Sequence, residues 1–196
     1  MYRVENLQAE IDIEQYIEEY INIEEFLECC RKCVNYEKKW SCPPFDFDVL
    51  EYWKKFKKLF IWGEKISFDW EAIEGKDQSE ESQKIINEVL GKEKQQLSEK
   101  LFELEKSYEG SISLSAGSCG LCGNGMMDNQ NCTRVSGCEG TAKEKCVHFD
   151  KMRYSIEALG GNVGKTCAKL LGIDLEWIEE NKLPTYFVLV CGLLKP

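Results

Sequence analysis

The sequence predicts an α+β fold, in which a small, mostly antiparallel sheet packs with helices and carries a loop region rich in cysteine and glycine. Helical periodicity is confined to separate segments, the longest of which covers residues 79–108. Short apolar or alternating runs, typical of strands, lie between these segments. The stretch 117–150 has neither pattern. The order of the predicted elements along the chain favours an α+β domain over a parallel α/β sheet. That order is strand, long helix, strand, loop, helices and strand.

The expected helices differ in length. Residues 14–28 place apolar side chains at helical spacing between acidic ones. The long segment 79–108 has an apolar stripe, weakened at Gly91, and Gly110 fits its end. The shorter helices are expected through residues 50–56, capped by Asp46 or Asp48, and over residues 155–159 and 164–171.

Three segments have the composition of strands. Residues 59–68 predict one strand, or a hairpin bent at Gly63. Residues 112–115 alternate, and residues 186–190 form an apolar run typical of a buried strand. The turn Gly160–Thr166 contains Gly-x2-Gly-Lys-Thr, but its glycine spacing is not that of a phosphate-binding loop, so we expect a joint between helices.

The size and charge of the chain limit the classes of function and partner that it can have. A chain of 196 residues that is 43% hydrophobic fits a single domain, residues 1–196. Its net charge of -10 repels phosphate backbones, so we expect no nucleic-acid partner. The longest apolar run, residues 186–194, falls short of the ~20 residues of a membrane-spanning helix. The N-terminus lacks the pattern of a signal peptide. We therefore expect a cytoplasmic protein without a membrane partner.

The 11 cysteines are the strongest functional signal. Disulfides are rare in a reducing compartment, and an odd number of cysteines cannot pair completely. Thiolates gathered in such a protein indicate a metal. The cysteines form two groups, residues 29–42 and residues 119–146.

The N-terminal group is Cys30-x2-Cys33-x8-Cys42, with Cys29 beside it. A C-x2-C pair can direct both sulfur atoms to one metal, and Cys42 comes from an extended segment stiffened by two prolines. Three cysteines can hold three corners of an iron–sulfur cluster or supply three of the four ligands of zinc.

The second group is Cys119-x2-Cys122, followed by Cys132, Cys138 and Cys146 among many glycines. Glycine lets the backbone approach a cluster and turn N–H groups toward sulfur, which favours iron–sulfur somewhat over zinc.

The remaining candidates are weaker. Cys191 lies in an apolar strand and Cys167 on a helix, where a lone cysteine is usually a small buried residue. For Cys29 and Cys132, the sequence does not decide between a metal ligand and a cysteine without a role in metal binding. His148, the one histidine, is expected near the site as a hydrogen-bond donor or a surface residue rather than as a ligand.

Several motifs resemble a bacterial and archaeal family known as predicted metal-binding proteins. They are the stretch from Cys30 to Phe45, Ser115-Ala-Gly-Ser-Cys119-Gly-Leu-Cys122, Cys146-Val-His148, residues 152–160 and residues 183–194. The resemblance implies that Cys30, Cys33 and Cys42 match the family's first cysteine group, and Cys119, Cys122 and Cys146 its second. The family usually has a cysteine about eight positions before the last one, where Cys138 stands here. An insertion containing Cys132 leaves the fourth ligand open between Cys132 and Cys138.

We therefore expect a metal-binding protein in which Cys119, Cys122, Cys138 and Cys146 hold an iron–sulfur cluster of the [4Fe–4S] type. Cys30, Cys33 and Cys42 form a second metal site or face the first. Electron transfer to a redox protein partner is the expected role. One alternative is structural zinc. Another is an enzyme with an open metal site at the N-terminal group, where Tyr36, Asp46, Asp48 or His148 serves as acid or base.

Overall fold

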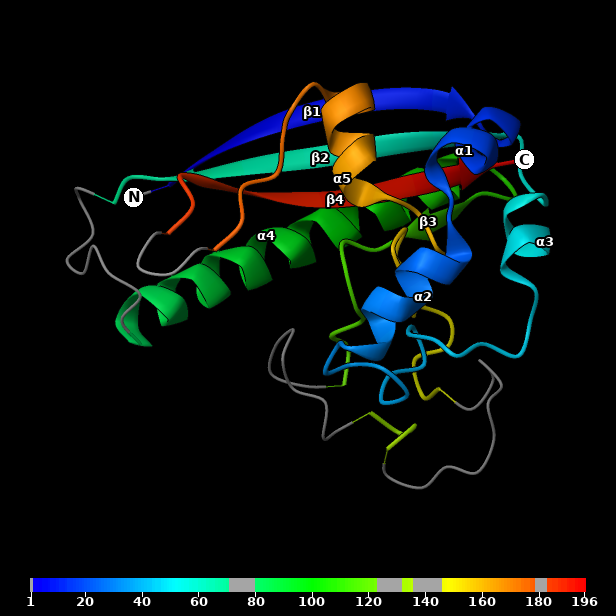
Figure 1. Ribbon diagram of the computed structural model, residues 1–196, viewed down its shortest axis with the longest axis horizontal. Helices are drawn as coiled ribbons and strands as arrows, with labels where there is room; N and C mark the ends of the chain where they lie inside the picture. Colours follow the sequence, from blue (N-terminus) through cyan, green and yellow to red (C-terminus); the bar gives the residue numbers. More distant parts are fainter. Residues whose placement is uncertain (1, 71–79, 123–131, 136–145, 179–182) are drawn as a thin grey trace.

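The protein has an α+β fold built on a four-stranded antiparallel sheet in the order β1-β2-β4-β3 (Figure 1). The structure is a computed structural model and describes residues 2–70, 80–122, 132–135, 146–178 and 183–196. The strands are β1 (Tyr2–Asp12), β2 (Lys58–Phe68), β3 (Ile112–Leu114) and β4 (Tyr186–Lys195). The predicted fold class is confirmed, and so are the strands expected over 112–115 and 186–190.

Strand β1 was not expected from the sequence. It pairs with β2 along its whole length, from Tyr2 opposite Phe68 to Asp12 opposite Lys58. As an edge strand of the described sheet, β1 has no neighbouring strand on one side and can carry more polar residues. These polar residues interrupt the apolar alternation on which strand prediction depends.

Strand β2 is continuous, so the alternative of a hairpin bent at Gly63 is wrong. Gly63 pairs with Leu7 on one side and with Val190 on the other. A Cβ atom at this position would lie 2.7 Å from Leu171 Cδ1. The glycine therefore lets a helical segment approach the face of the sheet closely.

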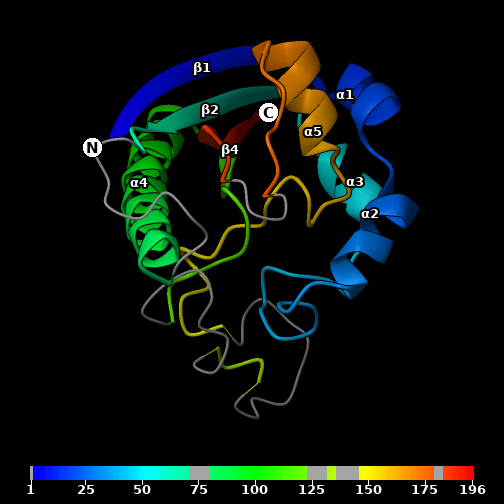
Figure 2. The same ribbon diagram turned by 60° about the vertical axis from the view of Figure 1, so that its left-hand side comes forward.

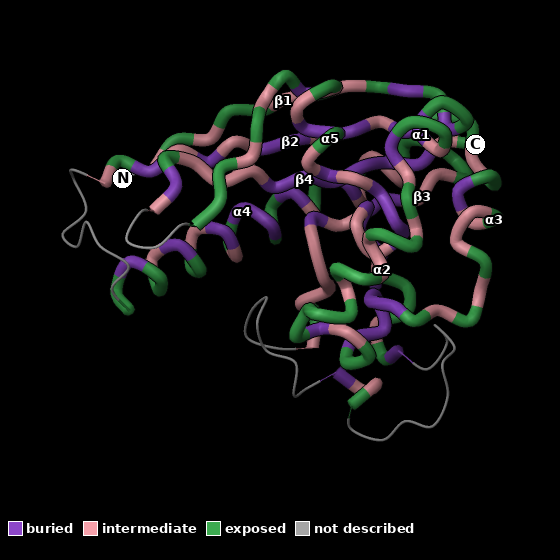
Figure 3. Tube along the Cα trace, viewed as in Figure 1, coloured by how far each residue is buried: buried purple, intermediate pink, exposed green. Residues whose placement is uncertain are grey.

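One face of the sheet packs against helix α4 (Glu80–Ser107), whose predicted extent is confirmed. Buried Leu97 and Leu101 of α4 pack with Ile66 of β2 and Cys191 of β4. Figure 3 shows buried residues along β2, β4 and one side of α4. Side chains alternate along a strand, so the neighbouring residues of β2 and β4 face the opposite side.

The opposite face carries the remaining helices. These helices are α1 (Ile13–Tyr20), α2 (Ile23–Arg31), α3 (Val49–Trp53), α5 (Val163–Thr166) and the π-helical turn η2 (Cys167–Leu171). Leu59 and Ile61 of β2 pack there with Tyr16 and Trp53. The side chain of Asp48 caps α3 by accepting the N–H of Glu51, as expected.

The helix expected over 14–28 is divided into α1 and α2. Ile21 forms a bridge with Gly161, the N–H of Asn22 donates to Gly160 O (2.9 Å), and the N–H of Asn162 donates to Tyr20 O (2.8 Å). These bonds replace those of a continuous helix. Asn22 then caps α2 through the N–H of Glu25. Residues 155–159, expected as a helix, form a bridge residue and turns instead.

Cys167 and Cys191 are fully buried, as expected of structural cysteines. Burial raises the pKa of Cys167 to about 12, which keeps this thiol protonated at neutral pH. In the part of the chain that the structure describes, no helix is both long enough and apolar enough to cross a membrane.

Gly160→Ala is expected to lower the free energy of unfolding by about 2–4 kcal/mol. Gly160 has a φ of 78°, and a Cβ atom there would lie 2.9 Å from the Cα atom of Ile23. The matched control is Gly91→Ala in α4, where nothing lies within 4 Å of the added Cβ. The control is expected to add about 0.5–1 kcal/mol. Urea unfolding of both variants checks the pair, and equal effects would contradict the close approach at Gly160.

Candidate metal centre

The two cysteine groups, far apart in sequence, meet at the end of the molecule away from the sheet (Figures 1 and 2). The segment after α2, the loop after β3 and the segment beginning at residue 146 lie side by side there in both views. None of the three lies within a helix or strand of the sheet. Hydrogen bonds and side-chain packing therefore hold them together.

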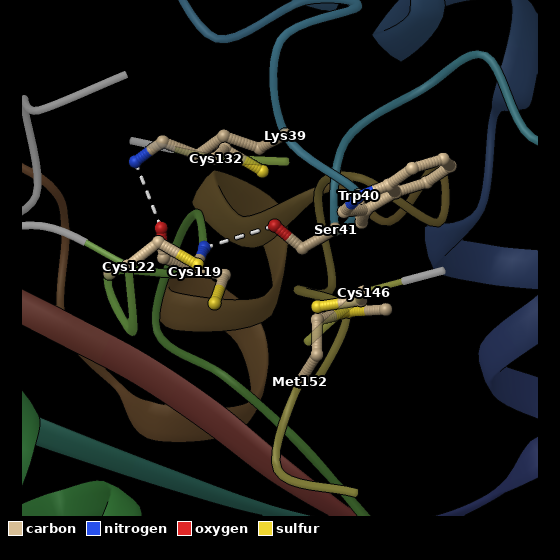
Figure 4. Close-up of a pocket in the computed structure, with 9 residues that line it drawn as sticks. Lys39, Trp40, Ser41, Cys119, Cys122, Cys132, Cys146 and Met152 are labelled. Carbon is tan, nitrogen blue, oxygen red and sulfur yellow. Dashed lines mark hydrogen bonds between the residues drawn. The ribbon is translucent and has the colours of Figure 1, made fainter. Parts of the chain in front are cut away.

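Four cysteines of the second group, Cys119, Cys122, Cys132 and Cys146, line one cavity of about 10 Å³ (Figure 4). Cys132 and Cys146 are buried, with 8% and 4% of their surface exposed. The cavity is closed by residues of the N-terminal segment, by the backbone between Cys119 and Cys122, and by the segment after Cys146. These residues are Lys39, Trp40, Ser41, Gly120 and Met152. The fold thus brings cysteines from three separate segments to the wall of one cavity.

The N-terminal segment forms a wall of this cavity through direct hydrogen bonds. The N–H of Cys119 donates to Ser41 Oγ at 3.0 Å, and Lys39 Nζ donates to Cys119 O at 2.8 Å (Figure 4). Trp40 Nε1 donates to Thr133 Oγ1 at 2.9 Å, directly after Cys132. Three consecutive residues of one cysteine group therefore position two cysteines of the other.

Arg134 fastens the turn that carries Cys132. Its Nη1 donates to Lys39 O (2.8 Å) and Cys42 O (2.5 Å), and its Nη2 donates to Pro44 O (2.9 Å). The guanidinium also lies over the Trp40 ring, 5.7 Å from its centroid. Hydrogen bonds from a charged donor are stronger than neutral ones, so this fork is a main link between the two cysteine groups.

The N-terminal thiols lie near one another, beside the cavity rather than in its wall. Cys30 belongs to the last turn of α2, and the N–H of Cys33 donates to Cys30 O at 2.9 Å. Cys42 is buried, whereas Cys29 and Cys33 are exposed. Burial, together with the neighbouring Cys42 and Cys33, raises the pKa of Cys30 to about 11. The N–H of Asn35 donates to Cys33 Sγ at 3.5 Å.

The thiols of Cys119 and Cys122 favour protonation unless a cation is close. Burial raises the pKa of Cys122 to about 11, with further contributions from Cys132, Cys146 and Cys119. Burial also raises the pKa of Cys119, whereas the N–H of Leu121 and the ammonium groups of Lys94 and Lys39 oppose that shift. A bound metal supplies the missing positive charge and releases these protons.

The donor set is suited to a metal that prefers sulfur. Among the residues that the structure describes, no three His, Cys, Asp or Glu side chains are arranged so that they could already hold an ion. A cavity of 10 Å³ is about the size of one water-sized sphere, so the thiols have to close around a single ion or separate for a cluster. Because their segments are loops, neither movement disturbs the sheet.

The remaining sequence candidates fall into three classes. Cys132, left open by the sequence, joins Cys119, Cys122 and Cys146 in the cavity wall. Cys138, expected as the fourth ligand, lies outside the described residues. His148 is not among the residues lining either described cavity, and its carbonyl accepts the N–H of Met152 at 2.7 Å.

Sequence reasoning missed the basic side chains around the site. Lys39 is 2% exposed and Lys94 is 8% exposed, an unusual burial for lysine. Lys94 shares the apolar face of α4 with Leu90, Leu97 and Leu101, and a lysine in such a stripe was the available signal. Lys39 and Arg134 each lie close to a cysteine in sequence, which was a weaker signal.

Arg134→Met is expected to cost about 1.5–3 kcal/mol of unfolding free energy, because three carbonyl groups lose a charged donor. Arg134→Lys is expected to recover only part of this loss, since an ammonium cannot reproduce the fork. The control is Arg31→Met, which removes an exposed pair with Glu28 and is expected to cost less than about 1 kcal/mol. Chemical denaturation of the three variants measures the differences. An unchanged free energy of unfolding for Arg134→Met would contradict the role of the guanidinium in joining the two cysteine groups.

Comparison with known proteins identifies the family of the chain. The family described as "Predicted metal-binding protein (DUF2284)" matches residues 17–192, which include both cysteine groups and all of the sheet except β1 and the end of β4. No curated protein and no solved structure matched the chain. The match covers most of the sequence, and the chain belongs to this family of predicted metal-binding proteins.

Proposed function

We propose that the protein is an iron–sulfur protein whose cluster, of the [4Fe–4S] type, is held by Cys119, Cys122, Cys146 and one further cysteine. The observation that carries the proposal is the convergence of four thiols from three loops on one cavity. Cys132 is the fourth ligand that we favour, because it lines that cavity. Cys138, expected from its distance to Cys146, is the rival.

The surroundings of the thiols support a resident anionic centre. Thiolate-ligated clusters are negatively charged, and hydrogen bonds to their sulfur atoms tune the reduction potential. The N–H of Leu121 is directed to the thiol of Cys119, and the ammonium groups of Lys39 and Lys94 lie close enough to lower its pKa. These groups stabilise negative charge at the same place, which a neutral buried pocket would not need.

A cluster bound there would supply one-electron redox chemistry. Leu121, between two of the proposed ligands, is 42% exposed, so the centre lies close to the surface. This position suits exchange of electrons with a redox protein partner. The N-terminal cysteines Cys30, Cys33 and Cys42 are proposed to hold a second metal or to shield the first, since they offer three thiols beside the same cavity.

Anaerobic purification or reconstitution with iron and sulfide tests the assignment. The chain is expected to bind iron and acid-labile sulfide in equal amounts and to show visible absorbance that reductant bleaches, with an EPR signal in the reduced form. Colourless protein holding stoichiometric zinc under the same conditions would instead establish the structural-zinc alternative and contradict the proposal.

Single substitutions identify the ligands. Cys122→Ser is expected to remove most of the bound iron, whereas Cys191→Ala is the matched control, because that thiol is buried beneath α4 and away from the cavity. Comparing Cys132→Ser with Cys138→Ser decides the fourth ligand. Loss of iron in the Cys138 variant alone would exclude Cys132 as the fourth ligand. Retention of the full visible spectrum in the Cys122 variant would contradict the proposed set of ligands.

A further inference from the structure

A second cavity, of about 60 Å³, adjoins the candidate metal centre. It lies between α4, β3 with the loop that follows it, and the segment after Cys146. Cys119 and Gly120 line both cavities, so the Cys-x2-Cys loop is the wall that separates them. Nothing in the proposed cluster ligation uses this second space.

Lys94 supplies a buried positive charge to the second cavity. Its ammonium donates to Ser118 O, and no carboxylate within the described ranges lies close enough to form an ion pair with it. Burial lowers the pKa of Lys94 to about 8. A buried ammonium is costly without an anion beside it, and one carbonyl accepts only one of its three N–H groups.

Two further basic residues line the same space. Lys151 is exposed and forms no ion pair with a carboxylate that the structure describes. Arg153 is held by both oxygens of Glu105, at 2.7 and 2.6 Å, and Glu105 also accepts the N–H and Oγ of Ser113. Glu105 thus balances Arg153, and neither Lys94 nor Lys151 forms an ion pair with a carboxylate that the structure describes. Such a pair of charges is notable in a chain of net charge -10.

The rest of the lining is apolar or already hydrogen-bonded. Leu101 and Phe102 of α4 form an apolar wall, with the Arg153 guanidinium 4.9 Å from the Phe102 ring centroid. The hydroxyls of Ser113 and Ser115 donate to Glu105 and Gly117 O respectively. The two ammonium groups are therefore the main donors left for a ligand, and they lie in the same cavity as a hydrophobic surface.

We propose that this cavity binds a small organic carboxylate, with its two oxygens on Lys94 and Lys151 and its carbon chain against Leu101 and Phe102. A carboxylate matches two ammonium donors, whereas phosphate would leave oxygen atoms without donors beside an apolar wall. The volume of 60 Å³ holds roughly four to six water-sized spheres, which suits a carboxylate of a few carbon atoms. This site requires neither the cluster nor zinc.

Isothermal titration of the full chain with acetate, butyrate and inorganic phosphate, at constant ionic strength, tests the site. Butyrate is expected to bind more tightly than acetate, by up to about fourfold for each additional methylene that is buried. Phosphate is expected to bind more weakly than butyrate. The titrations are made on metal-free and metal-loaded protein, so failure to load metal leaves the result for the carboxylate readable.

Lys94→Met and Lys151→Met are each expected to weaken butyrate binding at least tenfold. Lys84→Met is the matched control, since it removes the same charge from an exposed position on the same helix, and it is expected to leave the affinity unchanged. Lys151 is exposed, so its variant tests the site even if the Lys94 variant does not fold.

Three outcomes would overturn the assignment. They are no carboxylate binding by the unchanged chain, phosphate binding tighter than butyrate, and butyrate affinity unaffected by Lys151→Met. A Lys94 variant that loses metal but keeps its butyrate affinity would likewise assign Lys94 to charge balance at the thiols alone and contradict the site.

Discussion

Hydrogen bonds between residues 39–44 and the loops carrying Cys119 and Cys132 are the constraint on which the candidate site depends. Ser41 and Lys39 hold both backbone groups of Cys119, and Arg134 binds three carbonyl groups of the N-terminal segment. The sheet supplies a rigid base, but it does not itself bring these loops together. These hydrogen bonds join the separate segments that carry the cysteines.

Two buried lysines beside the cysteines give the site an otherwise unfavourable distribution of charge. Lys39 and Lys94 are buried in a chain with 25 basic and 35 acidic residues, so basic groups are scarce and two of them are placed at the greatest desolvation cost. That cost is offset where negative charge accumulates. Thiolates on a metal would provide such charge on one side of the Cys119 loop, and an anionic ligand would provide it on the other.

The sequence predicted those parts of the fold whose pattern is local. Helix α4 has a long apolar stripe, α3 has its cap at Asp48, and β4 is an apolar run bounded by turns. It did not predict β1, because polar residues at a sheet edge weaken the alternation. The division between α1 and α2 was missed for another reason: the bonds that replace the helix come from Gly160 and Asn162, far along the chain.

The same distinction applies to the site. The spacing of Cys119 and Cys122 is a local signal, and it led directly to the cavity that they line. The place of Cys132 in that cavity depends on Arg134 and Trp40, whose contacts span more than 90 positions and leave no local pattern. The burial of Lys94 could not be predicted for a similar reason. Lysine is common in helices, and only the packing of α4 shows that this one is buried.

The shared wall between the two cavities has a thermodynamic consequence. Lys94 lines the larger cavity, and its ammonium lies close enough to Cys119 to favour the thiolate. An anion bound to that ammonium would withdraw part of this stabilisation from the thiol. A negatively charged cluster held by the thiols would, in turn, place negative charge beside the same ammonium and weaken the binding of the anion. Linkage requires the two effects to be equal in free energy, so occupancy of either cavity changes the affinity of the other by the same factor.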